Sequence, residues 1–132
     1  MIHGKGAKKA LLKAINLVGD SVIGTLGPNA RTVLVQHEGH PPSVLNDGVK
    51  IVSSIRSSDP AVQVGIELFR QVALEAQQAS GDGTTTATLI AQALCEHYIN
   101  SEDPVNDAEA LKTFLKIAVE DLNKLSTPID MD

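Results

Sequence analysis

The sequence is poor in aromatic residues and has almost no cysteine. Aromatic side chains make up 2% of its 132 residues, and tryptophan is absent. A core of this chain has to be built from Ala, Val, Leu and Ile, which favours closely packed helices over an aromatic-rich sheet. The single cysteine, Cys95, cannot form an internal disulfide, so we expect a reducing compartment. Cys95 itself is predicted to be a small buried hydrophobe.

Basic residues are also scarce, and long apolar runs are missing. The formal net charge is -5, and the one short basic run, Lys5 to Lys13, is typical of the polar face of a helix. A nonspecific nucleic-acid surface needs clustered Lys and Arg, so we expect no nucleic-acid partner. No apolar run is long enough to cross a membrane, and the polar start Met1 to Lys5 lacks a signal core. The sequence therefore predicts a cytoplasmic protein.

Apolar periodicity predicts four long helices. They cover Ala7 to Leu26, Ala61 to Ser80, Thr84 to Asn100, and a last helix that begins at Asp103-Pro104 and ends at Thr127-Pro128. The first helix is expected to stop at Gly27-Pro28, because the residue before a proline disfavours the helical conformation. Asp59-Pro60 has the order of an N-cap followed by proline at the first helical position.

Two short extended segments predict a small β-hairpin. Arg31 to His37 is rich in β-branched residues, and Ser43 to Leu45 follows a turn that contains glycine and two prolines. Val49 to Ile55 fits a short helix or a strand equally well. The sequence thus predicts one mainly α domain, a multihelical bundle with a small hairpin.

The segment Gly81-Asp82-Gly83-Thr84-Thr85-Thr86-Ala87-Thr88 is typical of a phosphate-binding loop that opens a helix. Glycine permits positive φ and close approach of a ligand, and the first helical turn offers unpaired N–H groups and a partial positive charge. The threonine hydroxyls add donors for phosphate oxygens. Asp82 would repel bare phosphate but suits Mg²⁺, which bridges carboxylates and phosphates. Alternatively, Asp82 is only the N-cap of the helix. The Gly-Lys-Ser/Thr ending of a Walker A loop is missing.

This loop resembles the signature of the GroEL-type (group I) chaperonins. Two other segments resemble the same family, in the same order and spacing: Thr25-Leu26-Gly27-Pro28 with Arg31, and Asn46-Asp47-Gly48-Val49. The resemblance extends from about Gly4 to Pro128. It implies a chaperonin equatorial-domain fold, with residues 1–132 forming the N-terminal portion of the ATP-binding, ring-forming domain and with the hinge and apical domains absent from this chain.

The resemblance also implies a set of site residues. The nucleotide would be held by Thr25, Leu26, Gly27, Pro28, Asn46, Gly81, Asp82, Gly83, Thr84, Thr85 and Thr86. Asp82 would ligate Mg²⁺, and Asp47 would help to position or activate the water that attacks the γ-phosphate of ATP. K⁺ is a further candidate ion. From its neighbours alone, Asp47 is better interpreted as an ordinary turn residue before Gly48. Asn46 stands where the family usually has Lys, which removes one positive charge near the phosphates.

The function implied by the resemblance is that of an ATP-dependent chaperonin, which assists protein folding in a ring of identical subunits. Unfolded client proteins and a co-chaperonin would bind regions absent here, and the chain alone would lack part of the ATPase site. Because the sequence ends at Asp132, near the expected start of the hinge, it represents either a fragment of a longer protein or a naturally short relative. The alternative function is a non-enzymatic structural or assembly module that keeps the fold but does not hydrolyse ATP.

Overall fold

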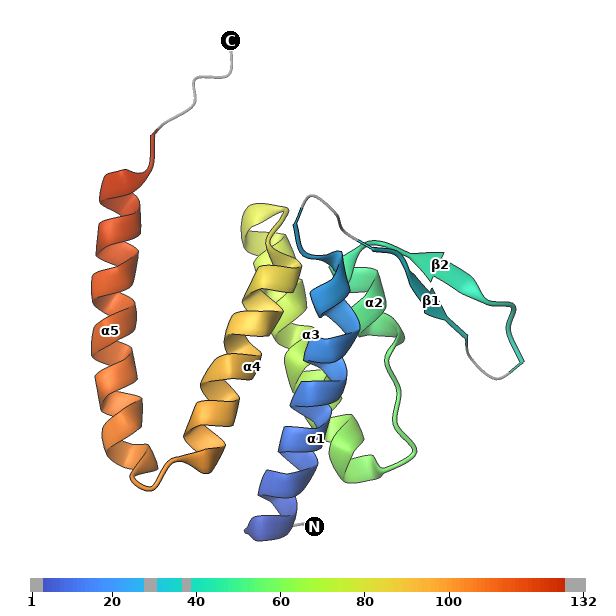
Figure 1. The fold of residues 1–132 in the computed structure, drawn as a ribbon, viewed down its shortest axis with the longest axis horizontal. Coiled ribbons are helices and arrows are strands. Elements are labelled where there is room, and N and C mark those ends of the chain that lie inside the picture. The colour runs from blue at the N-terminus through green and yellow to red at the C-terminus, as the bar shows by residue number, and fades with distance from the viewer. Residues whose placement is uncertain (1–3, 28–30, 37–38, 128–132) are drawn as a thin grey trace. The chain divides into compact units, whose positions relative to one another are not determined.

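The computed structural model describes residues 4–27, 31–36 and 39–127, and these form five α-helices, a 3-10 turn and a two-stranded sheet (Figure 1). In chain order the elements are α1 (Lys5–Val22), η1 (Ile23–Thr25), β1 (Val33–Val35), β2 (Ser43–Leu45), α2 (Gly48–Ser54), α3 (Pro60–Ser80), α4 (Thr84–Asn100) and α5 (Pro104–Leu125). The predicted mainly α fold with a small hairpin is confirmed. The chain divides into two compact units, of which the first extends to Ile99 and the second begins at Asn100.

The core of the first unit lies where α1, α2 and α3 pack against one another. Its buried side chains are almost all aliphatic, as the scarcity of aromatics requires: Ala14, Ile15, Val18, Val22, Ile51, Val52, Val62, Ile66, Phe69 and Ala73. Helix α4 adds partly buried apolar residues at the edge of this core, among them Leu89 and Cys95. Burial raises the pKa of the Cys95 thiol, which fits the predicted role of a small hydrophobe.

Two glycines let neighbouring helices approach closely. A Cβ on Gly65 of α3 would lie 2.5 Å from the Cβ of Ala14 on α1, so no larger residue fits without moving a helix. A Cβ on Gly19 of α1 would overlap the side-chain amide of Gln92 on α4, and that amide donates to Asn16 Oδ1 at 3.3 Å. Helix α1 therefore contacts α3 and α4 through positions where side chains are small or absent.

Most element boundaries follow local signals. Asp59 caps α3 by accepting a hydrogen bond from the Ala61 N–H at 2.9 Å, with Pro60 as the first helical residue. Helix α1 is shorter than predicted, because the chain tightens into a 3-10 turn at Ile23–Thr25 before Leu26. The segment that periodicity left open, Val49 to Ile55, is helical in α2.

The predicted hairpin is present. Strands β1 and β2 pair antiparallel, with Val33 opposite Leu45 and Val35 opposite Ser43. Strand β1 is shorter than the predicted segment from Arg31 to His37, and His37 lies outside the described residues.

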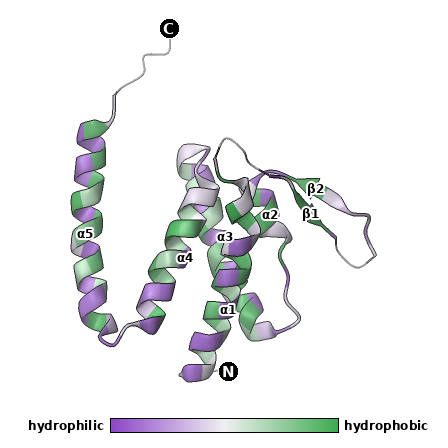
Figure 2. Cartoon of the chain, in the orientation of Figure 1, coloured by the Kyte–Doolittle hydropathy of each residue, from purple (hydrophilic) through white to green (hydrophobic). Residues whose placement is uncertain are grey.

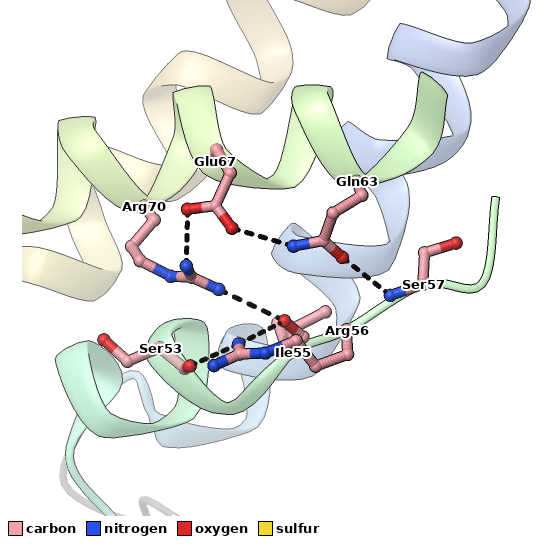
Figure 3. A network of polar contacts seen from close by, with 7 residues as sticks. All are labelled: Ser53, Ile55, Arg56, Ser57, Gln63, Glu67 and Arg70. Carbon is pink, nitrogen blue, oxygen red and sulfur yellow. Dashed lines mark hydrogen bonds and ion pairs between the residues drawn. The ribbon is translucent and has the colours of Figure 1, made fainter. Parts of the chain in front are cut away.

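The segment between α2 and α3 is fastened to α3 by a chain of polar contacts (Figure 3). Arg70 donates from Nη2 to the Ile55 carbonyl at 3.2 Å and pairs through Nη1 with Glu67 at 2.5 Å. Glu67 in turn accepts from Gln63 Nε2 at 2.8 Å, and Gln63 Oε1 accepts from the Ser57 N–H at 2.8 Å. These contacts hold the first residue and the middle of the connecting segment against α3.

The second unit contains α5, whose apolar residues recur along its whole length (Figure 2). Several of them, including Phe114, Leu122 and Leu125, are exposed. Ion pairs between side chains three residues apart, Glu109–Lys112 and Asp121–Lys124, lie on its polar surface. Within the described residues, neither α5 nor any other helix is long and apolar enough to cross a membrane.

Candidate functional site

Three segments that are distant in sequence meet around one open pocket of about 510 Å³. Its lining comprises Thr25, Leu26 and Gly27 after α1; Asn46, Asp47 and Gly48 before and at the start of α2; Gln77 in α3; and Gly81, Asp82, Gly83, Thr84, Thr85 and Thr86 between α3 and α4. The structure thus brings together every site residue expected from the sequence except Pro28, which lies outside the described residues. A volume of this size lies within the range of small-molecule sites.

The loop between α3 and α4 depends on two glycines with left-handed backbone. Gly81 ends α3 with a φ of 72° and donates its N–H to the Gln77 carbonyl at 2.9 Å. Gly83 has a φ of 79° and immediately precedes α4. Side chains with a Cβ rarely adopt this conformation. The two glycines therefore let the chain leave one helix and begin the next within three residues.

The first turn of α4 supplies backbone donors to this pocket. The bond from the Ala87 N–H to the Gly83 carbonyl, 2.8 Å long, is the first one within the helix. The N–H groups of Thr84, Thr85 and Thr86 consequently have no partner inside the helix. Unpaired amides and the partial positive charge of a helix start are the features that bind anions such as phosphate.

The hydroxyl hydrogens of two of these threonines are already used within the protein. Thr25 donates its hydroxyl hydrogen to the Val22 carbonyl at 2.7 Å, so the 2.9 Å contact between the Thr25 and Thr85 hydroxyls has to use the hydrogen of Thr85. Thr84 donates to Gln77 Oε1 at 3.2 Å. These two commitments differ from the expectation that the hydroxyls of Thr84, Thr85 and Thr86 all donate to phosphate oxygens. In this arrangement only the Thr86 hydroxyl can join the backbone amides as a donor.

Each of the two aspartates in the pocket uses one carboxylate oxygen to hold the backbone. Asp47 is the N-cap of α2 and accepts from the Val49 N–H at 2.9 Å, so it is a helix cap rather than a simple turn residue. Asp82 accepts from the Gly83 N–H at 2.6 Å, one residue before α4, and Gly83 rather than Asp82 occupies the N-cap position. The second oxygen of each carboxylate has no bond to another described residue and can bind a cation.

The charge of the lining restricts what the pocket can bind. Among the residues that the structure describes, the lining contains two carboxylates and no Lys, Arg or His. A bare triphosphate would be repelled, whereas a complex of phosphate with a divalent cation brings its own positive charge. Among the described residues no cluster of three or more His, Cys, Asp and Glu could hold a metal alone. That pattern suits Mg²⁺, which proteins bind through one or two carboxylates together with phosphate oxygens and water.

Two lining residues were not expected from the sequence as site residues, Gly48 and Gln77. A Cβ on Gly48 would lie 2.7 Å from Thr85 Oγ1, so this glycine lets the start of α2 touch the start of α4. Its place beside Asp47 in the Asn46–Val49 segment was the available signal. Gln77 belongs to no motif, and only its position four residues before the glycine that ends α3 could have indicated it.

Comparison with known proteins identifies the family. The TCP-1/cpn60 chaperonin family model matches residues 18–132, which includes all three pocket segments. The chain belongs to the TCP-1/cpn60 chaperonin family.

The solved structures most similar to this chaperonin chain include chaperonin gp146 from the Pseudomonas aeruginosa bacteriophage EL 2, in two crystal forms. Crystal form II superposes with a TM-score of 0.87 and 25% identity, over 98% of this chain and 23% of gp146. Crystal form I gives a TM-score of 0.66 and 31% identity, over 77% of this chain and 18% of gp146. Both gp146 structures were determined in the presence of ATP-BeFx. The chaperonin chain described here therefore spans about a quarter of the length of gp146.

Proposed function

We propose that this chaperonin chain binds Mg·ATP in the pocket between α1, α2 and α4, as the equatorial part of a ring-shaped chaperonin that hydrolyses ATP and assists protein folding. The observation that carries the proposal is that first-turn amides of α4 without a helical partner lie beside two carboxylates, in a lining whose described residues include no basic side chain. Amides suit the phosphates and carboxylates suit the cation that must accompany them. The presence of ATP-BeFx in the gp146 structures supports the same ligand.

Within this proposal the residues divide the work by their chemistry. The amides of Thr84, Thr85 and Thr86 bind phosphate oxygens, and Asp82 ligates Mg²⁺. Asp47 would position or activate the attacking water near the γ-phosphate, since phosphoryl transfer depends on positioning and on charge control. Thr25, Leu26, Gly27 and Asn46 contact the rest of the nucleotide, and K⁺ would need oxygen ligands from the same lining. We further propose that the protein assembles with copies of itself into a ring, acts on unfolded client proteins and is located in the cytoplasm.

The metal role of Asp82 is tested by Asp82→Asn, which keeps an oxygen for the Gly83 N–H but removes the charge. Affinity for Mg·ATP, measured by isothermal titration calorimetry on the native protein, should fall about 10- to 100-fold, corresponding to the loss of one charged interaction. Wild-type binding should also be lost when EDTA removes Mg²⁺. Asp20→Asn is the matched control, because Asp20 is exposed on α1 and lies outside the pocket. Equal affinity in Asp82→Asn and the wild type would contradict this assignment.

Asp47 is tested separately, because Asn is as good an N-cap as Asp and should preserve α2. In the assembled native protein, Asp47→Asn should bind Mg·ATP within a few-fold of wild type but hydrolyse it about 10²- to 10⁴-fold more slowly, the range for loss of a group that assists proton transfer. A variant that hydrolyses ATP at the wild-type rate would remove Asp47 from the mechanism.

One observation favours a second candidate function, a structural or assembly role without ATP turnover. Asn46 lines the pocket at the position where the resembled family usually carries Lys, so no positive side chain among the described lining residues offsets the two carboxylates. Calorimetry distinguishes the two functions. If the wild-type native protein forms rings, seen by light scattering and electron microscopy, and gives no heat of binding with Mg·ATP, the structural role holds and the nucleotide proposal fails.

A further inference from the structure

Gln77 stands out in the pocket because its amide connects the two ends of the loop between α3 and α4. Its Nε2 donates to the Gly81 carbonyl at 3.1 Å, and its Oε1 accepts from the Thr84 hydroxyl at 3.2 Å. The side chain is exposed in the open pocket, so the fold of the core does not depend on it. The glycines and threonines of the loop do not by themselves require a glutamine at this point.

These two bonds determine which way each group points. The Gly81 carbonyl can only accept, so the nitrogen of the Gln77 amide has to face it. The amide oxygen is then left to face Thr84, and an amide oxygen also can only accept. The Thr84 hydroxyl must therefore donate its single hydrogen to Gln77 Oε1. Toward the pocket it keeps only lone pairs.

We infer that Gln77 is a positioning residue of the nucleotide pocket: it ties the Gly81–Thr84 loop together and commits the Thr84 hydroxyl to accepting rather than donating. A hydroxyl that offers lone pairs repels a phosphate oxygen, which is also an acceptor. It attracts a divalent cation or the hydrogens of water bound to that cation. In a Mg·nucleotide complex, the hydroxyl oxygen of Thr84 would therefore face the cation or its bound water, while the Thr84 backbone N–H would donate to a phosphate oxygen.

The inference rests on the proposed function and adds a role that the binding of phosphate alone does not require. If Gln77 only capped the end of α3, its removal would loosen the loop and weaken nucleotide binding equally at all Mg²⁺ concentrations. If it orients Thr84 toward the cation, its removal should change the dependence on Mg²⁺. The half-saturating Mg²⁺ concentration for nucleotide binding is therefore the measurement that separates the two roles.

The experiment titrates Mg²⁺ at fixed ATP and follows nucleotide binding to the native protein for Gln77→Met, Thr84→Val and the double variant. Each single change should raise the half-saturating Mg²⁺ concentration about 3- to 10-fold, the effect of one or two hydrogen bonds. The double variant should be no worse than the more affected single variant, because both changes break the same interaction. Gln78→Met, on the exposed surface one residue further along α3 and outside the pocket, should match the wild type.

The outcomes are distinct. This inference is overturned if Gln77→Met has the same half-saturating Mg²⁺ concentration as Gln78→Met. It is also overturned if Gln77→Met weakens nucleotide binding without changing that concentration. In both cases the proposed function still stands. Additive effects of Gln77→Met and Thr84→Val also overturn it, since they would then act independently. A wild-type protein without Mg²⁺-dependent nucleotide binding overturns the proposed function, and this inference with it. Thermal unfolding of each variant checks that the fold is retained.

Discussion

The contact between Gly65 and Ala14 gives a quantitative prediction about how α1 and α3 are packed. In Gly65→Ala, the new methyl group would lie 2.5 Å from the Cβ of Ala14 and 3.5 Å from Leu11 Cδ1. Carbon atoms pack at about 3.5–4.0 Å, so the helices must separate by roughly 1 Å or more. Ala14 is fully buried and cannot swing away.

The expected magnitude combines two opposing terms. Overpacking a core costs about 1–3 kcal/mol, while replacing glycine by alanine inside a helix gains roughly 0.5–1 kcal/mol. We expect Gly65→Ala to lower the free energy of unfolding by about 1–2 kcal/mol, measured by urea denaturation followed by circular dichroism. Ala14→Gly in the same chain should recover part of this loss, because it vacates the space that the new methyl group needs.

Gly24→Ala provides the matched control for this prediction. A Cβ at Gly24 meets no other atom within 4 Å, and its backbone is not left-handed. The same chemical change should therefore be neutral or stabilising by up to about 1 kcal/mol. If Gly65→Ala proved as stable as Gly24→Ala, the close approach of α1 and α3 would not be a property of the protein in solution.

Two further predictions concern a helix start and the single thiol. Asp59→Ala removes the side chain that caps α3, so it should lower the free energy of unfolding, measured by urea denaturation, by about 1 kcal/mol. Asp59→Asn keeps the capping oxygen and should be nearly neutral. Equal losses in both variants would show that the charge rather than the cap matters. Burial raises the pKa of the Cys95 thiol, so a smaller fraction of it is thiolate in the folded chain than in the unfolded chain at the same pH. Iodoacetamide should therefore react with Cys95 more slowly in the folded chain than in urea at equal pH, and equal rates in both states would refute this reasoning.

The long helices could be predicted because their signals are local. The start of α4 at Thr84 follows from a glycine pair and a run of apolar residues, and its predicted bounds agree with the structure. The short helix α2 could not be assigned, since seven residues are too few to show a period. Its conformation is decided by Asp47, which caps it, and by burial of Ile51 and Val52 against helices elsewhere in the sequence.

The candidate site was predictable in membership but not in chemistry. The resemblance named nearly all of the lining, because the loop and turn motifs that form it are contiguous in sequence. It did not reveal that the hydrogens of the Thr84 and Thr85 hydroxyls are committed to Gln77 and Thr25. Which way a hydroxyl points depends on partners 7 and 60 residues away, and no local pattern encodes that.

Helix α2 is fastened at both of its ends. Asp47, at its start, lines the pocket, and the Ile55 carbonyl, just after its end, is held by Arg70 of α3. A helix of seven residues is about 10 Å long and has no glycine or proline in its interior that could bend it. The helix should therefore move as a rigid body. A shift of Asp47 caused by a ligand in the pocket would then be transmitted to the other end of the helix. Such a shift would move the Ile55 carbonyl and change its contact with Arg70, and through Arg70 the pair with Glu67. A spectroscopic label near the Arg70–Glu67 pair would therefore report on the state of the pocket.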